Sequence, residues 1–276
     1  MNRIVLGTSA LGSTVPQPVA LKILEAAYDI GIRNFDTAPL YGAGYAPSLL
    51  SRLRQNDITI STKFGSSWEP LTRFHLKRLL RARSFSDIWG KTPTRYSNQM
   101  REDSAWWSMP VQSGMIESAV TQLSGKRLDC IFMHGPPVLP SQNDIDELRS
   151  FVTSFGATLG ICSPTARDLR LLLASSDGID CLQMHLDDVL SVESTDLQRL
   201  LQKRLWIHGV YSPKAHSRYP DTANREAACV EFAALSDQIE FVISSKSVVG
   251  LGRLARLSEK FSCKPLRTPP TRAITR

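Results

Sequence analysis

The sequence predicts a single (β/α)8 barrel, an α/β fold in which eight parallel strands alternate with eight helices. The chain has 276 residues, of which 42% are hydrophobic and 21% are charged, a composition typical of one globular domain of barrel size. Short apolar runs alternate with stretches of helical periodicity along the whole chain. The runs are apolar on both faces, which is typical of strands that crossover helices cover.

The candidate strands are eight short apolar runs, at 3–7, 33–37, 58–63, 129–134, 158–162, 181–186, 205–211 and 240–245. The candidate helices alternate with them, at 19–30, 47–54, 113–123, 142–155, 165–174, 193–203, 224–235 and 248–260. In the first helix Ala20, Leu24 and Ala27 share one face, and Gly31 is suited to cap the C-terminus. A doubly wound sheet is the alternative. The turn LGTSALGS after the first run, however, only weakly resembles the GxGxxG turn of that fold.

One connection is much longer than the others. It runs from 64 to 112, between the third strand and its helix, and it contains four of the five tryptophans. Connections of this length in a compact domain are usually functional or disordered, and the tryptophans argue against disorder. We expect Trp106 and Trp107 to supply apolar surface to the wall of a substrate pocket. An outer surface of the barrel or a subunit contact is the alternative.

The net charge of +7 is concentrated in two segments, 71–103 with a local charge of +5 and 263–276 with +4. We expect the barrel to occupy 1–262 and the basic residues 263–276 to form a C-terminal tail. Neither segment has an RNP motif, zinc-finger spacing or a basic heptad array, so a nucleic-acid partner is not expected. The excess positive charge instead favours an anionic ligand.

The remaining composition points to an intracellular protein. No apolar run approaches the ~20 residues that span a bilayer, and MNRIVLGTSALGS is a poor secretory signal. The five cysteines, an odd number without CxxC spacing, are Cys130, Cys162, Cys181, Cys229 and Cys263. We therefore expect a soluble, cytoplasmic protein with reduced thiols, no metal site and no membrane partner. Nothing in the sequence indicates an oligomeric state.

Polar residues stand at the C-terminal ends of three successive candidate strands. Asp36 ends the second strand, Lys63 the third and His134 the fourth, and Tyr41 follows Asp36 in the adjoining loop. Because neighbouring barrel strands end at one mouth, we expect these side chains to meet. Asp36 would keep Lys63 charged, the ammonium would lower the pKa of Tyr41, and His134 could donate to the same oxygen. This set favours reduction of a C=O group, for which a nicotinamide cofactor must supply the hydride.

The segments GIRNFDTAPLYG, ITISTKFG and LDCIFMHGP resemble the motifs of the aldo-keto reductases, in the same order. The resemblance extends over nearly the whole chain, from LGTSALG to FVISSKS. It implies a (β/α)8 fold, with NADP(H) as the usual cofactor and NAD(H) less favoured. It also implies a catalytic tetrad of Asp36, Tyr41, Lys63 and His134, in which Tyr41 is the acid in reduction and the base in oxidation.

The same resemblance implies positions for the cofactor. GICSP stands where the family commonly has GxSN, so that Cys162 replaces the Ser and Ser163 replaces the Asn. Ser163 and Gln183 would contact the carboxamide, and Tyr211 would stack on the nicotinamide ring. Further contacts are implied to the pyrophosphate and the adenosine 2′-phosphate, from Ser212, Lys214, Lys246, Ser247 and Arg253.

We therefore expect an NADP-dependent oxidoreductase that interconverts an aldehyde or ketone, a sugar among the candidates, and the corresponding alcohol. The alternative is a cofactor-binding regulatory barrel with little or no turnover. The altered GICSP segment allows that alternative, and the intact tetrad argues against it. No residue pattern identifies the small-molecule substrate or the direction of the reaction.

Overall fold

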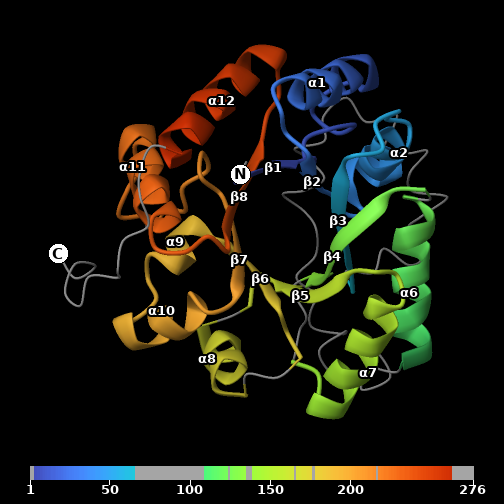
Figure 1. Cartoon of the computed structure of the whole chain (residues 1–276), viewed down its shortest axis with the longest axis vertical. Coiled ribbons are helices and arrows are strands. Elements are labelled where there is room, and N and C mark those ends of the chain that lie inside the picture. The colour runs from blue at the N-terminus through green and yellow to red at the C-terminus, as the bar shows by residue number, and fades with distance from the viewer. Residues whose placement is uncertain are drawn as a thin grey trace.

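The computed structural model describes residues 3–65, 109–123, 125–134, 139–164, 166–175, 178–215 and 217–262. Parallel strands form a closed barrel in the order β1 to β8, and helices surround it (Figure 1). The predicted (β/α)8 barrel is confirmed. Trp106, Trp107 and the basic tail 263–276 lie outside the described residues.

All eight predicted strands are present, as β1 (Ile4–Gly7), β2 (Asn34–Asp36), β3 (Thr59–Phe64), β4 (Arg127–His134), β5 (Thr158–Cys162), β6 (Cys181–His185), β7 (Arg204–His208) and β8 (Ile239–Ser244). The predicted helices correspond to α1 (Gln17–Asp29), α2 (Tyr45–Ser51), α6 (Met109–Thr121), α7 (Gln142–Thr153), α8 (Ala166–Ser175), α10 (Ser194–Leu200), α11 (Thr222–Ala233) and α12 (Val248–Ser262). Two short helices of the described residues were not predicted, η1 (Tyr41–Gly44) and α9 (Leu186–Val189).

The ends of several elements have local causes. Gly31 adopts a φ of 90°, as expected of a residue that ends α1. The seventh strand ends at His208 rather than at 211, because Gly209 turns the chain with a φ of 75°. Ser141 and Asp144 form a reciprocal capping box that starts α7.

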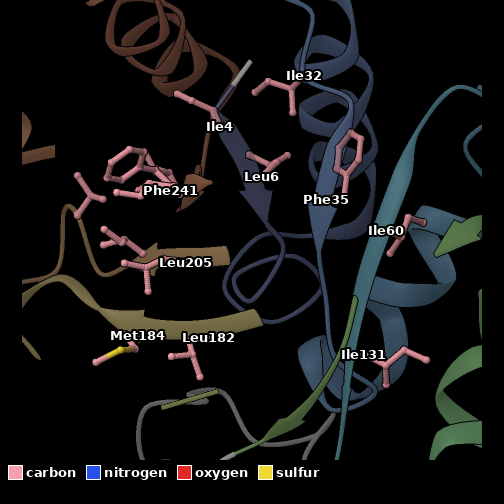
Figure 2. Close-up of a cluster of buried hydrophobic side chains, with 14 of the residues drawn as sticks. Ile4, Leu6, Ile32, Phe35, Ile60, Ile131, Leu182, Met184, Leu205 and Phe241 are labelled. Carbon is pink, nitrogen blue, oxygen red and sulfur yellow. The ribbon is translucent and has the colours of Figure 1, made fainter. Parts of the chain in front are cut away.

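The core has two parts. The larger cluster joins alternate strand residues to the helices around the barrel, and Figure 2 shows strand members of it such as Leu6, Phe35 and Leu205. The smaller cluster contains only strand residues, namely Val5, Cys130, Phe132, Cys162, Cys181, Trp206 and Val242. Because successive side chains of a strand face opposite sides, these residues fill the inside of the barrel.

Charged residues occupy the barrel at the amino-terminal ends of the strands. Arg204, the first residue of β7, donates to Asp129 of β4 at 2.6 and 2.8 Å and to Glu240 of β8 at 2.6 and 2.8 Å. Glu240 also accepts hydrogen bonds from the side chains of Trp206 and Asn34, at 2.7 and 3.1 Å. The same alternation along β7 then carries Trp206 into the middle of the barrel and His208 to its opposite end.

Candidate active site

A buried ion pair stands at the carboxyl ends of β2 and β3. Lys63 Nζ lies 2.5 and 2.6 Å from the two carboxylate oxygens of Asp36, and it also donates to the carbonyl oxygen of Thr37 at 3.1 Å. Both side chains are almost fully buried. Burial acts to lower the pKa of Lys63, but the carboxylate of Asp36 outweighs it and raises that pKa. Lys63 is therefore a fixed positive charge in the site.

Tyr41 lies over this pair. It begins η1 directly after the β2 loop, and its ring centre is 5.0 Å from Lys63 Nζ. Gly42 lets the chain turn there, since it has a φ of 59° and a Cβ would stand 2.4 Å from the carbonyl oxygen of Leu11. The ring of His134, at the end of β4, meets Tyr41 edge to face at 6.4 Å between centres. The structure thus brings all four residues of the predicted tetrad together.

The pKa of Tyr41 differs from the sequence-based expectation. Burial raises the pKa of Tyr41 to about 12, although Lys63 acts to lower it as expected. The prediction of a lowered pKa is therefore wrong, because loss of solvation outweighs the nearby ammonium. Burial, with Lys63 and His208, lowers the pKa of His134 to about 3. Tyr41 and His134 are thus both neutral hydrogen-bond donors near neutral pH.

A cavity of about 300 Å³ opens at this end of the barrel, and Asp36, Tyr41 and His134 line it. Its opposite wall contains four of the predicted cofactor-binding residues, Ser163, Gln183, Tyr211 and Ser212. The structure therefore joins the predicted tetrad and part of the predicted cofactor site in one cavity, with Lys63 beneath Tyr41.

The side chain of Gln183 is oriented to accept a hydrogen bond from a carboxamide ligand. Its side-chain nitrogen donates to Asp36 at 3.2 Å, which fixes the orientation of the amide because a carboxylate only accepts. The other atom, Oε1, is buried without a hydrogen-bond partner among the described residues. A buried acceptor without a partner is costly, and a ligand N–H in the cavity would satisfy it.

Ser163 has an unusual backbone. It is the one non-glycine residue with a positive φ, 55°, in the described part of the chain, and its amide donates to the Gln183 carbonyl at 2.7 Å. The left-handed conformation favours Gly and Asn over Ser. The backbone at this position therefore has the shape that an asparagine adopts more readily than a serine.

The other predicted cofactor residues lie outside this cavity. Lys214 forms an ion pair with Asp188 and lines a neighbouring cavity of about 410 Å³. Lys246 is exposed between β8 and α12, and the Ser247 hydroxyl accepts the amide of Gly250 at 3.1 Å, which caps α12.

The side chain of Arg253, on α12, contacts residues of two other segments. It pairs with Glu226 of α11 at 3.0 Å, and its guanidinium carbon lies 4.7 Å from the ring centre of Tyr211. The Tyr211 hydroxyl donates to the same carboxylate at 3.0 Å. Figure 1 shows α11 and α12 side by side, and α11 also packs against β8. Arg253 must therefore leave or share Glu226 before it can bind a phosphate.

Two features of the site were missed in the sequence. His208 lines the cavity from β7, and its position two residues after the inward-facing Trp206 is a signal of period two that could have identified it. Arg225 is fully buried on α11. Its helical spacing to Ala228, Cys229 and Phe232 places it on the apolar face, where an arginine stands out.

The described residues contain no cluster of three or more His, Cys, Asp or Glu that could hold a metal ion. None of the helices in the described ranges is both long enough and apolar enough to cross a membrane. The four described cysteines, Cys130, Cys162, Cys181 and Cys229, are buried and free.

Curated relatives match parts of this chain. D-threo-aldose 1-dehydrogenase from a Pseudomonas species is 28% identical over 134 residues, which cover 46% of this chain and 36% of the relative. Pyridoxal 4-dehydrogenase from Microbacterium luteolum is 44% identical over 66 residues, 22% of this chain and 19% of the relative. The matched segments thus span well under two thirds of the length of either relative.

Solved structures match over almost the whole chain. An aldo-keto reductase from Klebsiella pneumoniae, in complex with NADPH, superposes with a TM-score of 0.60 at 13% identity over 98% of this chain and 92% of its own. A glycerol dehydrogenase from Gluconobacter oxydans gives 0.59 at 14% identity, over 98% and 95%. The sequence profile described as the aldo/keto reductase family matches residues 3–260. The resemblance seen in the motifs is confirmed, and the chain belongs to the aldo-keto reductase family of oxidoreductases.

Proposed function

We propose that this protein is an NADP(H)-dependent oxidoreductase that interconverts an aldehyde or ketone and the corresponding alcohol, with Tyr41 as general acid and base. The observation that carries the proposal is the meeting of Tyr41, His134 and the buried Lys63–Asp36 pair at one cavity. A regulatory barrel without turnover would have no need of a buried ammonium beside a neutral phenol.

The described residues fit a nicotinamide cofactor. The unpartnered Gln183 Oε1 can accept an N–H from the carboxamide, and the Tyr211 ring lines the same cavity. When bound, the cofactor supplies the hydride that no side chain can supply. The exposed Lys246 at the N-terminus of α12 stands where a helix favours an anion, which supports NADP(H) over NAD(H).

The side chains have separate roles in reduction. His134, neutral because of its low pKa, donates a hydrogen bond to the carbonyl oxygen and orients it. Tyr41 donates the proton to that oxygen, and Lys63 stabilises the phenolate that remains. Asp36 holds the ammonium in position. In the oxidation of an alcohol the same phenolate would accept the proton.

For the substrate we propose a class of compounds and not a single molecule. The names of the relatives, an aldose dehydrogenase and a pyridoxal dehydrogenase, support polar carbonyl or alcohol compounds, and sugars are the first class to test.

The proposal is tested with the purified full-length chain. NADPH titration should quench tryptophan fluorescence. A panel of aldehydes, ketones and sugars should then show substrate-dependent oxidation of NADPH, followed by the loss of absorbance of the reduced nicotinamide. Tyr41→Phe, which removes only the phenol hydroxyl and leaves the buried Lys63–Asp36 pair intact, is the matched inactive control. Binding of NADPH without turnover on any compound would instead favour the regulatory barrel.

A further inference from the structure

Three neighbouring strands bring polar groups to the same wall of the cavity. Ser163 follows β5, Gln183 lies on β6 and His208 ends β7, and all three line the cavity of about 300 Å³. In the pairing of β6 with β7, Gln183 is opposite Trp206 and His185 is opposite His208. His208 is therefore the inward-facing residue one step nearer the mouth on the strand beside Gln183.

Two polar atoms of this wall are buried without hydrogen-bond partners among the described residues, Gln183 Oε1 and His208 Nε2. Buried polar atoms in native proteins almost always have a partner. The neighbouring His185 cannot provide one, because its Nε2 lies 2.9 Å from the Ser212 carbonyl and its Nδ1 accepts the Asp187 amide at 3.2 Å. Gln183 Oε1 requires a donor and His208 Nε2 can take either role, so a ligand with two N–H donors would satisfy both atoms.

A carboxamide has matching chemistry, with two N–H donors and one carbonyl acceptor. Gln183 Oε1 can only accept, because the nitrogen of its amide is held by Asp36. Ser163 has one hydroxyl, which can donate to the carbonyl. Burial, with His185 and Lys63, lowers the pKa of His208 to about 4, so the imidazole is neutral and one of its nitrogens can accept.

We propose that His208 accepts the second N–H of the nicotinamide carboxamide through Nε2, while Gln183 accepts the first and Ser163 donates to the carbonyl. His208 thereby supplies the second acceptor of this wall, which the single hydroxyl of Ser163, used as the donor, does not supply. The inference rests on the proposed function, since it requires that the cavity bind a nicotinamide.

The test compares two cofactors that differ only at the carboxamide. NADPH has both N–H groups, whereas its acetylpyridine analogue has a methyl group in their place. Dissociation constants are measured by fluorescence quenching for the wild type, His208→Phe and His208→Gln, without any turnover. His208→Phe should weaken NADPH binding about threefold to tenfold, the range for one neutral hydrogen bond, and should leave the affinity for the analogue unchanged. His208→Gln retains an acceptor and should recover part of the loss.

The outcomes separate the two proposals. If His208→Phe weakens the binding of NADPH and of the analogue equally, or weakens the binding of neither, the role of His208 is overturned while the proposed function stands. Failure of the wild type to bind NADPH would overturn both. Thermal unfolding of each variant, with the same midpoint as the wild type, shows that a changed dissociation constant comes from the site and not from a loss of folded protein.

Discussion

Arg225 bonds both carboxylate oxygens of Asp187, at 2.7 and 3.3 Å, in the interior of the protein. It also donates to the carbonyl oxygens of Gly209 at 2.7 Å, Val210 at 2.8 Å and Tyr219 at 3.1 Å. One buried side chain of α11 therefore holds α9 and both ends of the loop that follows β7. That loop contains Tyr211, whose ring lines the cavity. The contacts of Arg225 with Asp187 and this loop, here called the Arg225 clamp, therefore set the position of one wall of the site.

Arg225→Met should lower the free energy of unfolding by about 3–5 kcal/mol, because it leaves the Asp187 charge buried without its partner. Urea unfolding followed by circular dichroism measures the loss. The double variant Arg225→Met/Asp187→Leu should lose less than the single one, since no charge then stays buried. A single-variant loss below about 1 kcal/mol would mean that water or another group replaces the arginine.

Tyr41→Phe should lower turnover by about 10² to 10⁴-fold, the contribution expected of a positioned acid. The ring still packs and only the hydroxyl is lost, so the dissociation constant for NADPH should change little. Steady-state rates and a cofactor titration on the same preparation measure both quantities. Near-normal turnover would show that another group donates the proton.

The pH dependence should follow from the pKa of Tyr41, which burial raises to about 12. An acid with a raised pKa stays protonated until the pH approaches that value. Carbonyl reduction should therefore be flat from about pH 5 to about pH 10, while alcohol oxidation, which needs a proton acceptor, should rise with pH. His134, with a pKa of about 3, adds no titration in this range. A fall in kcat/KM for reduction near pH 7 or 8 would contradict the raised pKa.

Lys246→Ala should reduce the preference for NADPH over NADH. A charged contact to phosphate contributes roughly 1.5–3 kcal/mol, or about tenfold to a hundredfold in affinity. Titration of both cofactors against the wild type and the variant gives the ratio. Arg256→Ala, an exposed arginine on the same helix, is the control for a general loss of positive charge. If Lys246→Ala weakens the binding of NADPH and NADH equally, Lys246 does not contact the 2′-phosphate.

Ser163→Asn should stabilise the fold and retain cofactor binding. Asparagine adopts the positive φ of 55° at lower cost than serine, and its side-chain N–H keeps a donor toward the carboxamide carbonyl. The unfolding midpoint and the NADPH dissociation constant are the two measurements, and Ser163→Ala should weaken binding. A larger NADPH dissociation constant in Ser163→Asn than in the wild type would show that the asparagine amide does not fit beside His208.

The sequence predicted the strands and the meeting of the tetrad because both follow from local patterns. Asp36, Lys63 and His134 are the last polar residues of buried strands, and a parallel barrel brings such ends together. The pKa of Tyr41 could not be predicted in the same way. Its direction depends on the balance between burial and one ammonium, and burial is known only when the packing is known.

The Arg225 clamp and the short helix beside it were missed for a related reason. The four residues of α9 contain two aspartates and show no helical periodicity of their own. They are helical because His185 caps them, while Arg225, 38 positions away from Asp187, binds that carboxylate. Contacts across that separation leave little trace in local periodicity, so this part of the site required the structure.

The charged cluster at the amino-terminal ends of the strands has a consequence for how the barrel closes. Arg204 and its partners come from β4, β7 and β8, and Asn34 adds β2. A slip of one residue in any of these strands would turn its polar group away from the others and leave charges without partners in the interior. The cluster therefore favours a single register between the strands, and so a single shear of the barrel. That register determines which side chains lie next to one another at the carboxyl ends of the strands, where the cavity opens.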